Sequence, residues 1–362
     1  MTPRPIMILA GGTGGHVYPA LAVARALQRE SQEIVWLGTH RGIESRVVPA
    51  AGIPIEWVAV SGLRGKGPAA LVLAPFKLIF ALSQSLYVMW KHRPAAVLGM
   101  GGFVSGPGGL AAWLTRRPLV IHEQNAISGL TNRLLARLAR VVLQAFPGSF
   151  NAKTNAETVG NPVRADIASI DEPGTRLAGR EGPIHLLILG GSLGALALNQ
   201  IVPAALALLS DDIRPVVRHQ TGDRTLNEAR TAYADHNIDA ELSPYIEDMA
   251  EAYAWADLVI CRAGALTVAE LSAVGLPAIF VPFPSAVDDH QTANARPMAD
   301  AGAATVVQQS DLNDESLARL LRIWLANRAE LLDRSRKSRS LARPDALNRI
   351  TRVCLECAGV VS

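Results

Sequence analysis

Short apolar runs alternate with helical patterns along most of the chain, and this alternation constrains the fold more than any other feature. IMILA at 6–10 precedes PALAVARALQRE at 19–30, and AAVLGMGG at 95–102 precedes PGGLAAWLT at 107–115. Further apolar runs of the same kind are EIVWLG, LVIHEQ and VVLQAF. Apolar runs of about five residues separated by amphipathic helices are typical of βαβ units, in which helices bury both faces of a parallel sheet. The sequence therefore predicts an α/β protein with parallel sheets.

The pattern stops and restarts in the middle of the chain. After VGNPVR and the polar stretch ASIDEPGTRLAGREGP at 168–183, it resumes with HLLILGGSLGALALNQIVPAAL at 185–206. Further strand candidates are PVVRHQT, ELSPYI, DLVICRAG and PAIFVPF. Because 362 residues suffice for two cores, we expect two doubly wound domains joined near 160–180, with ligand bound in the cleft between them. A last helical pattern, from about 344 to 361, could pack on either domain.

Three glycine-rich loops each follow a predicted strand and open a predicted helix: GGTGGH at 11–16, GMGGFVSGPGG at 99–109 and GGSLGA at 190–195. Glycine lets the backbone approach a ligand closely, and a helix N-terminus offers N–H groups and a positive dipole end to an anion. The first and third loops do not match G-x-G-x-x-G, and no G-x-x-x-x-G-K-[ST] occurs, which disfavours dinucleotide oxidoreductases and P-loop NTPases. The loops together predict binding of several phosphates.

Charge is divided unevenly, although the net charge is only +3. Residues 1–164 carry 17 Lys and Arg against 6 Asp and Glu, a balance of +11, and residues 165–362 carry 18 against 26, a balance of −8. A basic half joined to an acidic half indicates that the first half faces a polyanion. Because the basic residues are not interleaved with aromatic side chains, we expect no nucleic-acid partner and favour an anionic membrane surface.

The segment from Gly62 to Pro94 is a local candidate for membrane contact. Lys77 divides it into uncharged runs of 10 and 13 residues, both shorter than the ~18 residues that a membrane-spanning helix needs. Phe76, Ile79 and Phe80 lie at its centre between lysines and arginines, as in a surface that rests on a bilayer interface. A core helix of an α/β domain would explain the same pattern.

The cysteines and the N-terminus indicate a reducing compartment. Cys261, Cys354 and Cys357 are the three cysteines of the chain, and they do not make a disulfide framework. CLEC at 354–357 has the spacing of metal ligands, but no second pair accompanies it, so we interpret it as structural. MTPRPIMILAGG lacks the charged and apolar regions of a signal peptide, and we expect a cytoplasmic protein.

Several motifs together carry a resemblance to a known family. They are GGTGGHVYPALAVA, SGLRGKG, VLGMGGFVSGPGGLAAW, HEQNAISGLTNRLLA, VGNPVR, GGSLGALALN, GLPAIFVPFP and DDHQTANA. In this order the chain resembles the UDP-N-acetylglucosamine:N-acetylmuramyl-(pentapeptide) pyrophosphoryl-undecaprenol N-acetylglucosamine transferases, the bacterial enzymes of the GT-B superfamily that form lipid II. These enzymes move N-acetylglucosamine from UDP-N-acetylglucosamine to undecaprenyl-pyrophosphoryl-N-acetylmuramyl-pentapeptide, which is lipid I.

The resemblance implies a GT-B fold, with two Rossmann-like domains and the active site in the interdomain cleft. It implies an acceptor- and membrane-binding domain over 1–163, a UDP-sugar-binding domain over 164–340, and a C-terminal helix over 341–362 that packs back on the N-terminal domain. It favours docking of the residues near Phe76, Ile79 and Phe80 on an anionic membrane. We therefore expect a peripheral protein at the cytoplasmic face of the bacterial inner membrane, with cell-wall synthesis or division proteins as further partners.

His16 ends the first glycine loop, and the reaction implied by the resemblance gives it a role. An α-linked donor that becomes a β-linked product requires in-line attack by the acceptor hydroxyl, a base for its proton, and positive potential for the departing UDP. Histidine ordinarily titrates near neutral pH, so we expect His16 to be the general base. The alternatives are a helix N-terminal residue bonded to its own loop, and a cation that binds acceptor phosphate.

The resemblance also implies which residues contact the substrates. The residues implied to bind the donor are Thr13, Gly14, Gly15, Asn125, Arg164, Ser192, Ile246, Ala265, Leu266, Thr267, Val268, Ala269, Glu270 and Gln291. Among them, Arg164 and Ser192 are expected at the diphosphate and Ile246 at uracil. The carboxylate of Glu270 is expected at the ribose hydroxyls, and Gln291 at the sugar. The acceptor pyrophosphate is assigned to Gly101, Gly102 and Ser105.

Two positions depart from the family pattern. Leu193 stands where a glutamine is common and Ala263 where a serine is common; both keep their backbone groups, so the departures bear on donor affinity. No D-x-D carboxylate pair is present, and the acidic pair at 288–289 is the one metal-binding candidate near the site. Because a helix dipole and Arg164 supply positive potential, we expect no obligate metal, with stimulation by Mg²⁺ left open.

Two other functions stay open on the residues. A UDP-N-acetylglucosamine 2-epimerase would share the two-domain architecture and the donor, but would not need SGLRGKG, the apolar segment or GMGGFVSGPGG. A non-catalytic membrane protein that binds a nucleotide sugar would keep the loops, but would have no reason to place His16 beside the sugar.

Overall fold

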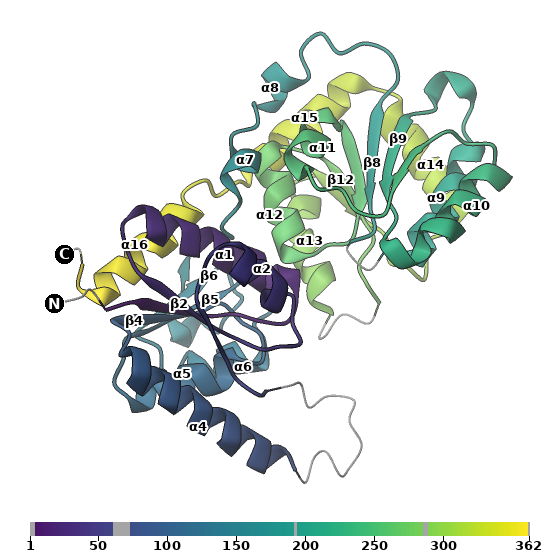
Figure 1. The fold of residues 1–362 in the computed structure, drawn as a ribbon. Helices are drawn as coiled ribbons and strands as arrows, with labels where there is room; N and C mark the ends of the chain where they lie inside the picture. The colour runs from purple at the N-terminus through teal and green to yellow at the C-terminus, as the bar shows by residue number, and fades with distance from the viewer. Residues whose placement is uncertain (1–3, 61–72, 192–193, 285–288, 361–362) are drawn as a thin grey trace. The chain divides into compact units, whose positions relative to one another are not determined.

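The computed structural model describes residues 4–60, 73–191, 194–284 and 289–360, which fold as two compact units (Figure 1). One unit contains residues 1–163 and 343–362, and the other contains residues 164–342. Each is a parallel sheet with helices on both faces, which confirms the predicted α/β class. Ser192, Leu193, Asp288 and the SGLRGKG segment lie outside the described residues.

The N-terminal unit is built on a seven-stranded parallel sheet. Its strands are β1 (Ile6–Leu9), β2 (Ile34–Gly38), β3 (Ile55–Trp57), β4 (Ala96–Gly99), β5 (Leu119–Glu123), β6 (Val141–Gln144) and β7 (Glu157–Thr158). In space the order is β3-β2-β1-β4-β5-β6-β7. The strand order reverses between β1 and β4, where Leu9 pairs with Gly99, so the loops after these two strands leave the sheet side by side.

Helices cover both faces of this sheet. One face carries α1 (Gly14–Arg29), α2 (Glu44–Ala50) and α16 (Ala346–Ala358), and the other carries α4 (Ala74–His92), α5 (Ser105–Leu114) and α6 (Leu130–Leu135). In Figure 1, α16 (yellow) lies beside α1 (purple), and it also contacts β4 and β5. Its apolar stripe, which includes Ile350, Val353 and Cys354, is buried in the core of the N-terminal unit, so the last helix belongs to the first half of the fold.

The C-terminal unit repeats the same strand order. Its strands are β8 (His185–Leu189), β9 (Val216–Gln220), β10 (Glu241–Ser243), β11 (Leu258–Cys261), β12 (Ala278–Phe280) and β13 (Ala304–Val306), in the spatial order β10-β9-β8-β11-β12-β13. Its helices are α7 (Ala165–Ala168), α8 (Pro173–Arg176), α9 (Leu196–Ala207), α10 (Leu226–Asp235), α11 (Met249–Trp255), α12 (Ala265–Val274), α13 (His290–Asp300), α14 (Asp314–Leu325) and α15 (Arg328–Ser340). Here the order reverses between β8 and β11, which are paired along their whole length.

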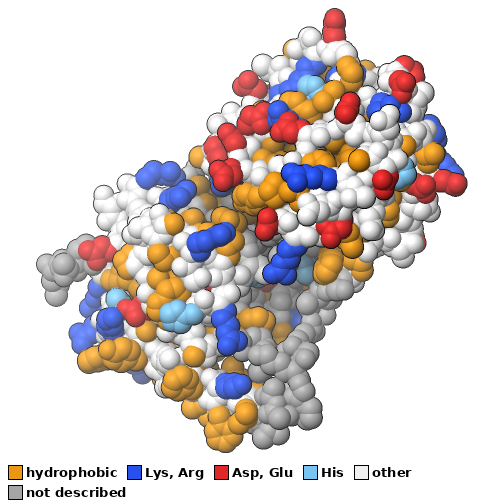
Figure 2. Space-filling view, turned by 45° about the vertical axis from the view of Figure 1, so that its right-hand side comes forward, with side chains coloured by type: hydrophobic (Ala, Val, Ile, Leu, Met, Phe, Trp, Pro, Cys, Tyr) orange, Lys and Arg blue, Asp and Glu red, His pale blue; other side chains and the backbone are white. Residues whose placement is uncertain are grey.

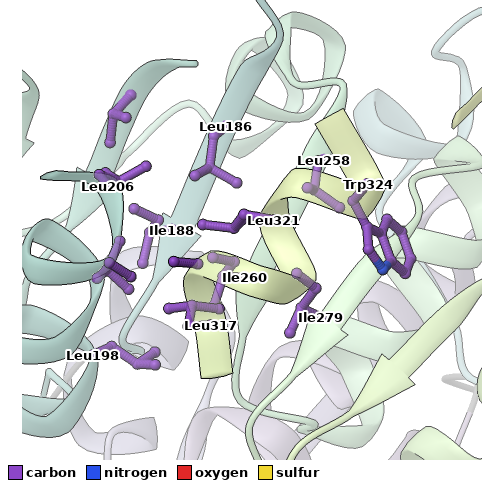
Figure 3. Close-up of a cluster of buried hydrophobic side chains, with 14 of the residues drawn as sticks. Leu186, Ile188, Leu198, Leu206, Leu258, Ile260, Ile279, Leu317, Leu321 and Trp324 are labelled. Carbon is purple, nitrogen blue, oxygen red and sulfur yellow. The ribbon is translucent and has the colours of Figure 1, made fainter. Parts of the chain in front are cut away.

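One face of the C-terminal sheet is buried under α9 and α14, as Figure 3 shows. The side chains that meet there are Leu186, Ile188, Leu198, Leu206, Leu258, Ile260, Ile279, Leu317, Leu321 and Trp324. Burial of each contributes roughly 2 kcal/mol relative to exposure. α14 starts at a capping box between Asn313 and Ser316, which fixes which side of the helix faces the sheet. This layer fixes β8 and β11, whose carboxyl ends lead into the third glycine loop and the turn before α12.

The polar stretch between the two predicted domains is a folded part of the C-terminal unit. Arg176 donates to the carbonyl of Ala256, and Arg180 donates to the carbonyl of Trp255, both at 2.7 Å. Arg180 also pairs with the buried carboxylate of Asp257 at 2.7 Å. Burial lowers the pKa of Arg176 to about 10. A flexible linker would leave these guanidinium groups in water, whereas here they fasten the stretch to the end of α11.

Candidate active site

Four helices that start at the strand reversals begin without a side-chain cap and without an acidic residue in the first turn. The helices are α1, α5, α9 and α12; none has a side-chain hydrogen bond from its N-cap residue or an acidic residue in its first turn. In the described chain α4, α6, α8, α13 and α16 also lack both features, whereas α11, α14 and α15 are capped by Asp248, Asn313 and Asn327 and carry acids in the first turn. The positive dipole end of a helix that has no capping side chain and no nearby acid favours an anionic ligand.

The first glycine loop is held from below by the carboxylate of Glu44, which is fully buried. Its Oε2 accepts from the N–H of Gly12 at 2.9 Å, and its Oε1 accepts from the N–H and the hydroxyl of Thr39 at 3.0 and 2.7 Å. Gly12 has a φ of +96°, a conformation that favours glycine. Glu44 was not singled out by the sequence, because nothing in RGIES distinguishes it from a surface acid.

The second glycine loop packs directly on the first. A Cβ atom at Gly101 would lie 2.6 Å from Nδ1 of His16, and one at Gly102 would lie 2.2 Å from the carbonyl oxygen of Gly11. Both residues also have positive φ, +96° and +80°, so only glycine fits at either position. This close approach brings the residues predicted for the acceptor pyrophosphate next to His16.

Ser105 has a different environment from the one expected. Its side chain is fully buried, and its hydroxyl lies 3.1 Å from the carbonyl oxygen of Leu9 and 2.8 Å from that of Gly101. The same oxygen accepts from the N–H of Gly101 at 3.1 Å. In this conformation the Ser105 hydroxyl ties the second loop to β1, and its expected contact with the acceptor pyrophosphate stays a prediction.

His16 lies in the first turn of α1; its backbone N–H donates to Thr13 of its own loop, whereas its side chain bonds to Gln124, directly after β5. Its Nδ1 is 3.0 Å from Oε1 of Gln124. Nε2 of Gln124 is 3.0 Å from Nδ1 of His122, and Nε2 of His122 is 2.8 Å from the carbonyl oxygen of Gly160. Burial lowers the pKa of His122 to about 4, so this ring is neutral near pH 7. Sequence reasoning missed both residues, although polar letters directly after the apolar run LVI are a usable signal.

Asn125, expected at the sugar, is oriented by the buried carboxylate of Glu123. Oε1 of Glu123 accepts from the N–H of Asn125 at 3.0 Å and from its Nδ2 at 3.2 Å. Oε2 accepts from the N–H of Gly129 at 3.1 Å and from Nδ2 of Asn132 at 2.9 Å. Four donors therefore satisfy one buried carboxylate, and the loop after β5 is fixed from beneath.

In the C-terminal unit the third glycine loop and the segment expected at uracil are both tied to β9. A Cβ atom at Gly194 would lie 2.4 Å from the carbonyl oxygen of Thr221, which follows β9 directly. The N–H of Ile246 donates to Oε1 of Gln220, the last residue of β9, at 3.0 Å. Gln220 is buried, so a side chain from the sheet sets the position of Ile246. Nothing in PVVRHQT distinguishes Gln220 from its polar neighbours.

Glu270 of α12 forms a buried hydrogen-bonded pair with Tyr253 of α11. The hydroxyl of Tyr253 donates to its Oε2 at 2.9 Å. Burial raises the pKa of Glu270 to about 7, against the opposing effects of the Tyr253 hydrogen bond and the charge of Arg164. The structure therefore brings together Arg164 and Glu270, two residues predicted for the donor that are far apart in the sequence.

The turn before α12 and the start of α13 are held by side-chain amides. Ala263 is fully buried, and its carbonyl accepts from Nδ2 of Asn294 at 3.1 Å, so this turn is fixed without the serine common in the family. Oε1 of Gln291 accepts from the N–H of Phe283 at 2.9 Å, which turns its Nε2 to the opposite side. Gln291, expected at the sugar, thus has a defined amide orientation.

The predicted residues divide into two sets, each at the carboxyl ends of one sheet. Thr13, Gly14, Gly15, His16, Gly101, Gly102, Ser105 and Asn125 follow β1, β4 and β5 in the N-terminal unit. Ile246, the residues 265–270 and Gln291 follow β10, β11 and β12 in the C-terminal unit, which also contains Arg164. Among the described residues, no three His, Cys, Asp or Glu side chains are grouped so as to hold a metal ion.

The N-terminal unit also exposes an apolar face. Residues 75–80, near the start of α4, are all exposed, with Phe76 at 69% and Ile79 at 65%, whereas the rest of the helix buries Ala81, Val88 and Met89. α4 contacts α5 and α5 contacts α6, and further large apolar side chains are exposed on both. Figure 2 shows hydrophobic side chains exposed on the N-terminal unit beside lysine and arginine side chains. In the described part of the chain, no helix is both long and apolar enough to cross a membrane.

Two family models match the chain. The model of the glycosyltransferase family 28 N-terminal domain matches residues 6–144, and that of the family 28 C-terminal domain matches residues 185–350. A protein of Alkalilimnicola ehrlichii is 58% identical over 352 residues, 97% of this chain and 98% of the relative. It is named UDP-N-acetylglucosamine--N-acetylmuramyl-(pentapeptide) pyrophosphoryl-undecaprenol N-acetylglucosamine transferase.

Solved structures agree with these matches. The crystal structure of Acinetobacter baumannii MurG has a TM-score of 0.86 and 43% identity, and the match covers 98% of this chain and all of that one. The UDP-GlcNAc 2-epimerase of Neisseria meningitidis has a TM-score of 0.67 with 13% identity, over 97% of this chain and 99% of the epimerase. The second likeness is one of fold alone.

Proposed function

The chain belongs to glycosyltransferase family 28, and from that membership we propose that it transfers N-acetylglucosamine from UDP-N-acetylglucosamine to the muramyl 4-hydroxyl of undecaprenyl-pyrophosphoryl-MurNAc-pentapeptide. This is the step from lipid I to lipid II in peptidoglycan synthesis. The observation that carries the proposal is the match along 97% of the chain to a transferase of that name. The epimerase alternative is not favoured, because the likeness to an epimerase stops at the fold.

The N-terminal unit supplies the base. His16 accepts the proton of the acceptor hydroxyl while the oxygen attacks the anomeric carbon from the side opposite UDP, which inverts the configuration. Gly101 packs tightly on His16, so the backbone of the second glycine loop lies directly against the imidazole, with no side chain between them. A pyrophosphate bound at the N-termini of α1 and α5 would therefore bring its muramyl group close to the base.

The C-terminal unit binds the donor and stabilises the leaving group. The positive dipole ends of α9 and α12 and the guanidinium of Arg164 supply positive potential where negative charge develops on UDP. Ile246 meets uracil, and Glu270 accepts from the ribose hydroxyls. Because backbone dipoles and one arginine do this electrostatic work, the reaction needs no resident metal, and Mg²⁺ acts at most as a stimulant.

The apolar face of α4 docks the enzyme on the bilayer that holds the acceptor. Phe76, Ile79 and Phe80 are more than half exposed, and Lys77 lies among them. Buried apolar area and attraction of basic residues to anionic lipids, about 1 kcal/mol for each Lys or Arg near the surface, together support peripheral binding. The protein would then act at the cytoplasmic face of the inner membrane, where its nucleotide-sugar donor is available.

The function is tested with the purified full chain, UDP-N-acetylglucosamine labelled in the sugar, and a short-chain analogue of lipid I. We expect labelled disaccharide lipid, formed with and without EDTA. UDP release or conversion of the sugar to its 2-epimer without lipid product would overturn the acceptor assignment. Product formation that EDTA abolishes would overturn the metal-independent mechanism but leave the transferase assignment intact.

A further inference from the structure

The buried side chains of His122 and Gln124 connect the carbonyl of Gly160 to His16 by hydrogen bonds. We infer that Gln124 is a positioning residue that keeps the single proton of neutral His16 on Nδ1, so that Nε2 is the nitrogen that accepts the proton of the substrate hydroxyl. The role of Nε2 rests on the proposed function, whereas the position of the proton follows from the hydrogen bonds and from the neutral state of the buried His122.

The direction of the hydrogen bonds is set at the Gly160 end. A carbonyl oxygen only accepts, so Nε2 of His122, 2.8 Å away, must carry a hydrogen. Burial lowers the pKa of His122 to about 4, so its ring holds one proton at neutral pH and its Nδ1 has none. That nitrogen can only accept, and its partner at 3.0 Å is the amide group of Gln124. The NH₂ of Gln124 therefore points to His122.

The reverse orientation of the Gln124 amide is excluded by two contacts. It would place Oε1 against the unprotonated Nδ1 of His122 at 3.0 Å and against the carbonyl oxygen of His122 at 3.2 Å. Gln124 is 1% exposed, so water cannot relieve two contacts between acceptors, and both contacts are unfavourable. Oε1 must then face His16, and an amide oxygen requires a hydrogen on Nδ1.

The consequence for the reaction is a choice between tautomers. With the hydrogen on Nδ1, Nε2 has a lone pair: the hydroxyl O–H bond breaks, an Nε2–H bond forms, and the oxygen bonds to the anomeric carbon as the bond to UDP breaks. The imidazolium so formed keeps Nδ1–H against Oε1, and that hydrogen bond becomes charge-assisted. The nearest carboxylate on the same strand, Glu123, is turned to Asn125, Gly129 and Asn132, so an amide and not a charge orients the base.

The tautomer can be read without any substrate. The chain has eight histidines, and ¹⁵N-histidine labelling with a His16→Gln spectrum identifies the His16 resonances. At about pH 8, where a typical imidazole is neutral, two-bond ¹H–¹⁵N correlation should give the Nδ1–H form in the wild type. Gln124→Met removes the acceptor and should populate the Nε2–H form. Gln124→Glu keeps an oxygen opposite Nδ1 in either state of its carboxyl, and should retain the Nδ1–H form.

Gln144→Met is the matched control. Gln144 also stands at the end of a strand, is 6% exposed and is bonded on both sides, to Thr158 and to the N–H of Phe150, but it does not touch His16. Its replacement should lower the thermal stability about as much as Gln124→Met does and leave the His16 tautomer unchanged. If both methionine variants changed the His16 spectrum equally, the effect would be one of general loosening, and the inference would be overturned.

Kinetics separate positioning from binding. Gln124→Met should lower kcat by about tenfold or more while KM for UDP-N-acetylglucosamine stays within about twofold, because the donor contacts are assigned elsewhere. Gln124→Glu, measured at its own optimum pH, should recover most of that kcat. An unchanged kcat in Gln124→Met, or a wild-type His16 already in the Nε2–H form, would overturn the inference and leave the transferase assignment untouched. Absence of lipid product from the wild type would overturn the proposed function, while the spectra would still report the tautomer.

Discussion

The N-terminal and C-terminal units share one strand order and one pair of loops at its reversal, yet the side chains placed there differ. In the N-terminal unit, α1 presents an imidazole that is connected through Gln124 to a buried backbone carbonyl. In the C-terminal unit, the first turns of α9 and α12 carry no titratable side chain, and the nearest carboxylate, Glu270, is buried one turn further along. In the proposed function, the common backbone provides anion binding in both units, and the supporting side chains determine which unit performs proton transfer.

The outer surfaces differ as well. Large exposed apolar side chains gather on α4, α5 and α6 of the N-terminal unit, whereas on the C-terminal unit they are scattered over unrelated elements. Residues 1–164 are basic by +11, and residues 165–362 are acidic by −8. A unit that meets a membrane-bound pyrophosphate gains from both features, and a unit that binds a nucleotide sugar from solution needs neither.

The largest effect should come from His16→Ala. Removal of a general base costs about 10³-fold in kcat, and binding of UDP, assigned to the C-terminal unit, should stay within about twofold. The measurement is steady-state transfer to the lipid I analogue together with calorimetric titration of UDP. His40→Ala is the matched control, because His40 is exposed in the same unit and only stacks on Trp57. Loss of UDP binding in His16→Ala would contradict the assignment of donor binding to the C-terminal unit and of proton transfer to the N-terminal unit.

Glu270→Gln tests the C-terminal side through stability. The folded pKa of about 7 lies above the ordinary value of 4.5, so the folded state holds a proton on Glu270 that the unfolded state releases between these values. The stabilisation is complete below about pH 4.5 and is lost as pH rises through about 7, a change of up to about 3 kcal/mol. Without nucleotide, Glu270→Gln should match the wild type in Tm near pH 5 and exceed it near pH 8. A difference that stays constant with pH would contradict the buried carboxyl.

Ile79→Ser addresses the exposed face of α4. Ile79 is 65% exposed, and loss of its apolar carbons should weaken partition to vesicles that contain anionic phospholipid by about tenfold. Ile323→Ser on α14 of the C-terminal unit, where the side chain is 56% exposed, makes the same change on the other surface and should leave partition unaltered. Co-sedimentation with vesicles measures both. If both variants lost vesicle binding equally, membrane contact would not be specific to the exposed face of α4.

The fold class and the strands with two neighbours could be predicted from the sequence, because most of these strands are apolar runs that end at or close to a glycine or a polar residue. The strands that were missed are β3, β7 and β13, which are sheet edges only two or three residues long. An edge strand pairs on one side and need not be apolar: β7 is formed by Glu157 and Thr158, and Glu157 bonds to Arg349 of α16. Such a strand is specified by its partner and carries little pattern of its own.

The site divides in a similar way. The glycine loops and His16 could be found from the sequence, because a loop with positive φ angles requires glycine, and several glycines directly after an apolar run are easy to recognise. Glu44, Gln124 and Gln220 act from beneath the loops across 26 residues or more, through contacts that only the fold creates. The sequence of α4 fits both the core-helix and the surface interpretation, because each describes part of the helix. Residues 75–80 are exposed, whereas Ala81, Val88 and Met89 pack on the sheet.

The smallest effect, and the sharpest comparison of the units, should come from Gln220→Met. Gln220 and Gln124 are both buried glutamines at the end of a strand, but Gln220 accepts from the backbone N–H of Ile246, whereas Gln124 faces an imidazole. Loss of one neutral hydrogen bond, about 1 kcal/mol, should let the uracil segment shift and raise the Kd of UDP by about three- to fivefold with kcat unchanged. Gln124→Met should do the opposite, with lower kcat and unaltered Kd. The measurements are UDP titration and kinetics at saturating substrate on the two variants in parallel. The same substitution should impair UDP binding in the C-terminal unit and catalysis in the N-terminal unit. Two variants with the same kinetic defect would show that the units are not specialised in this way.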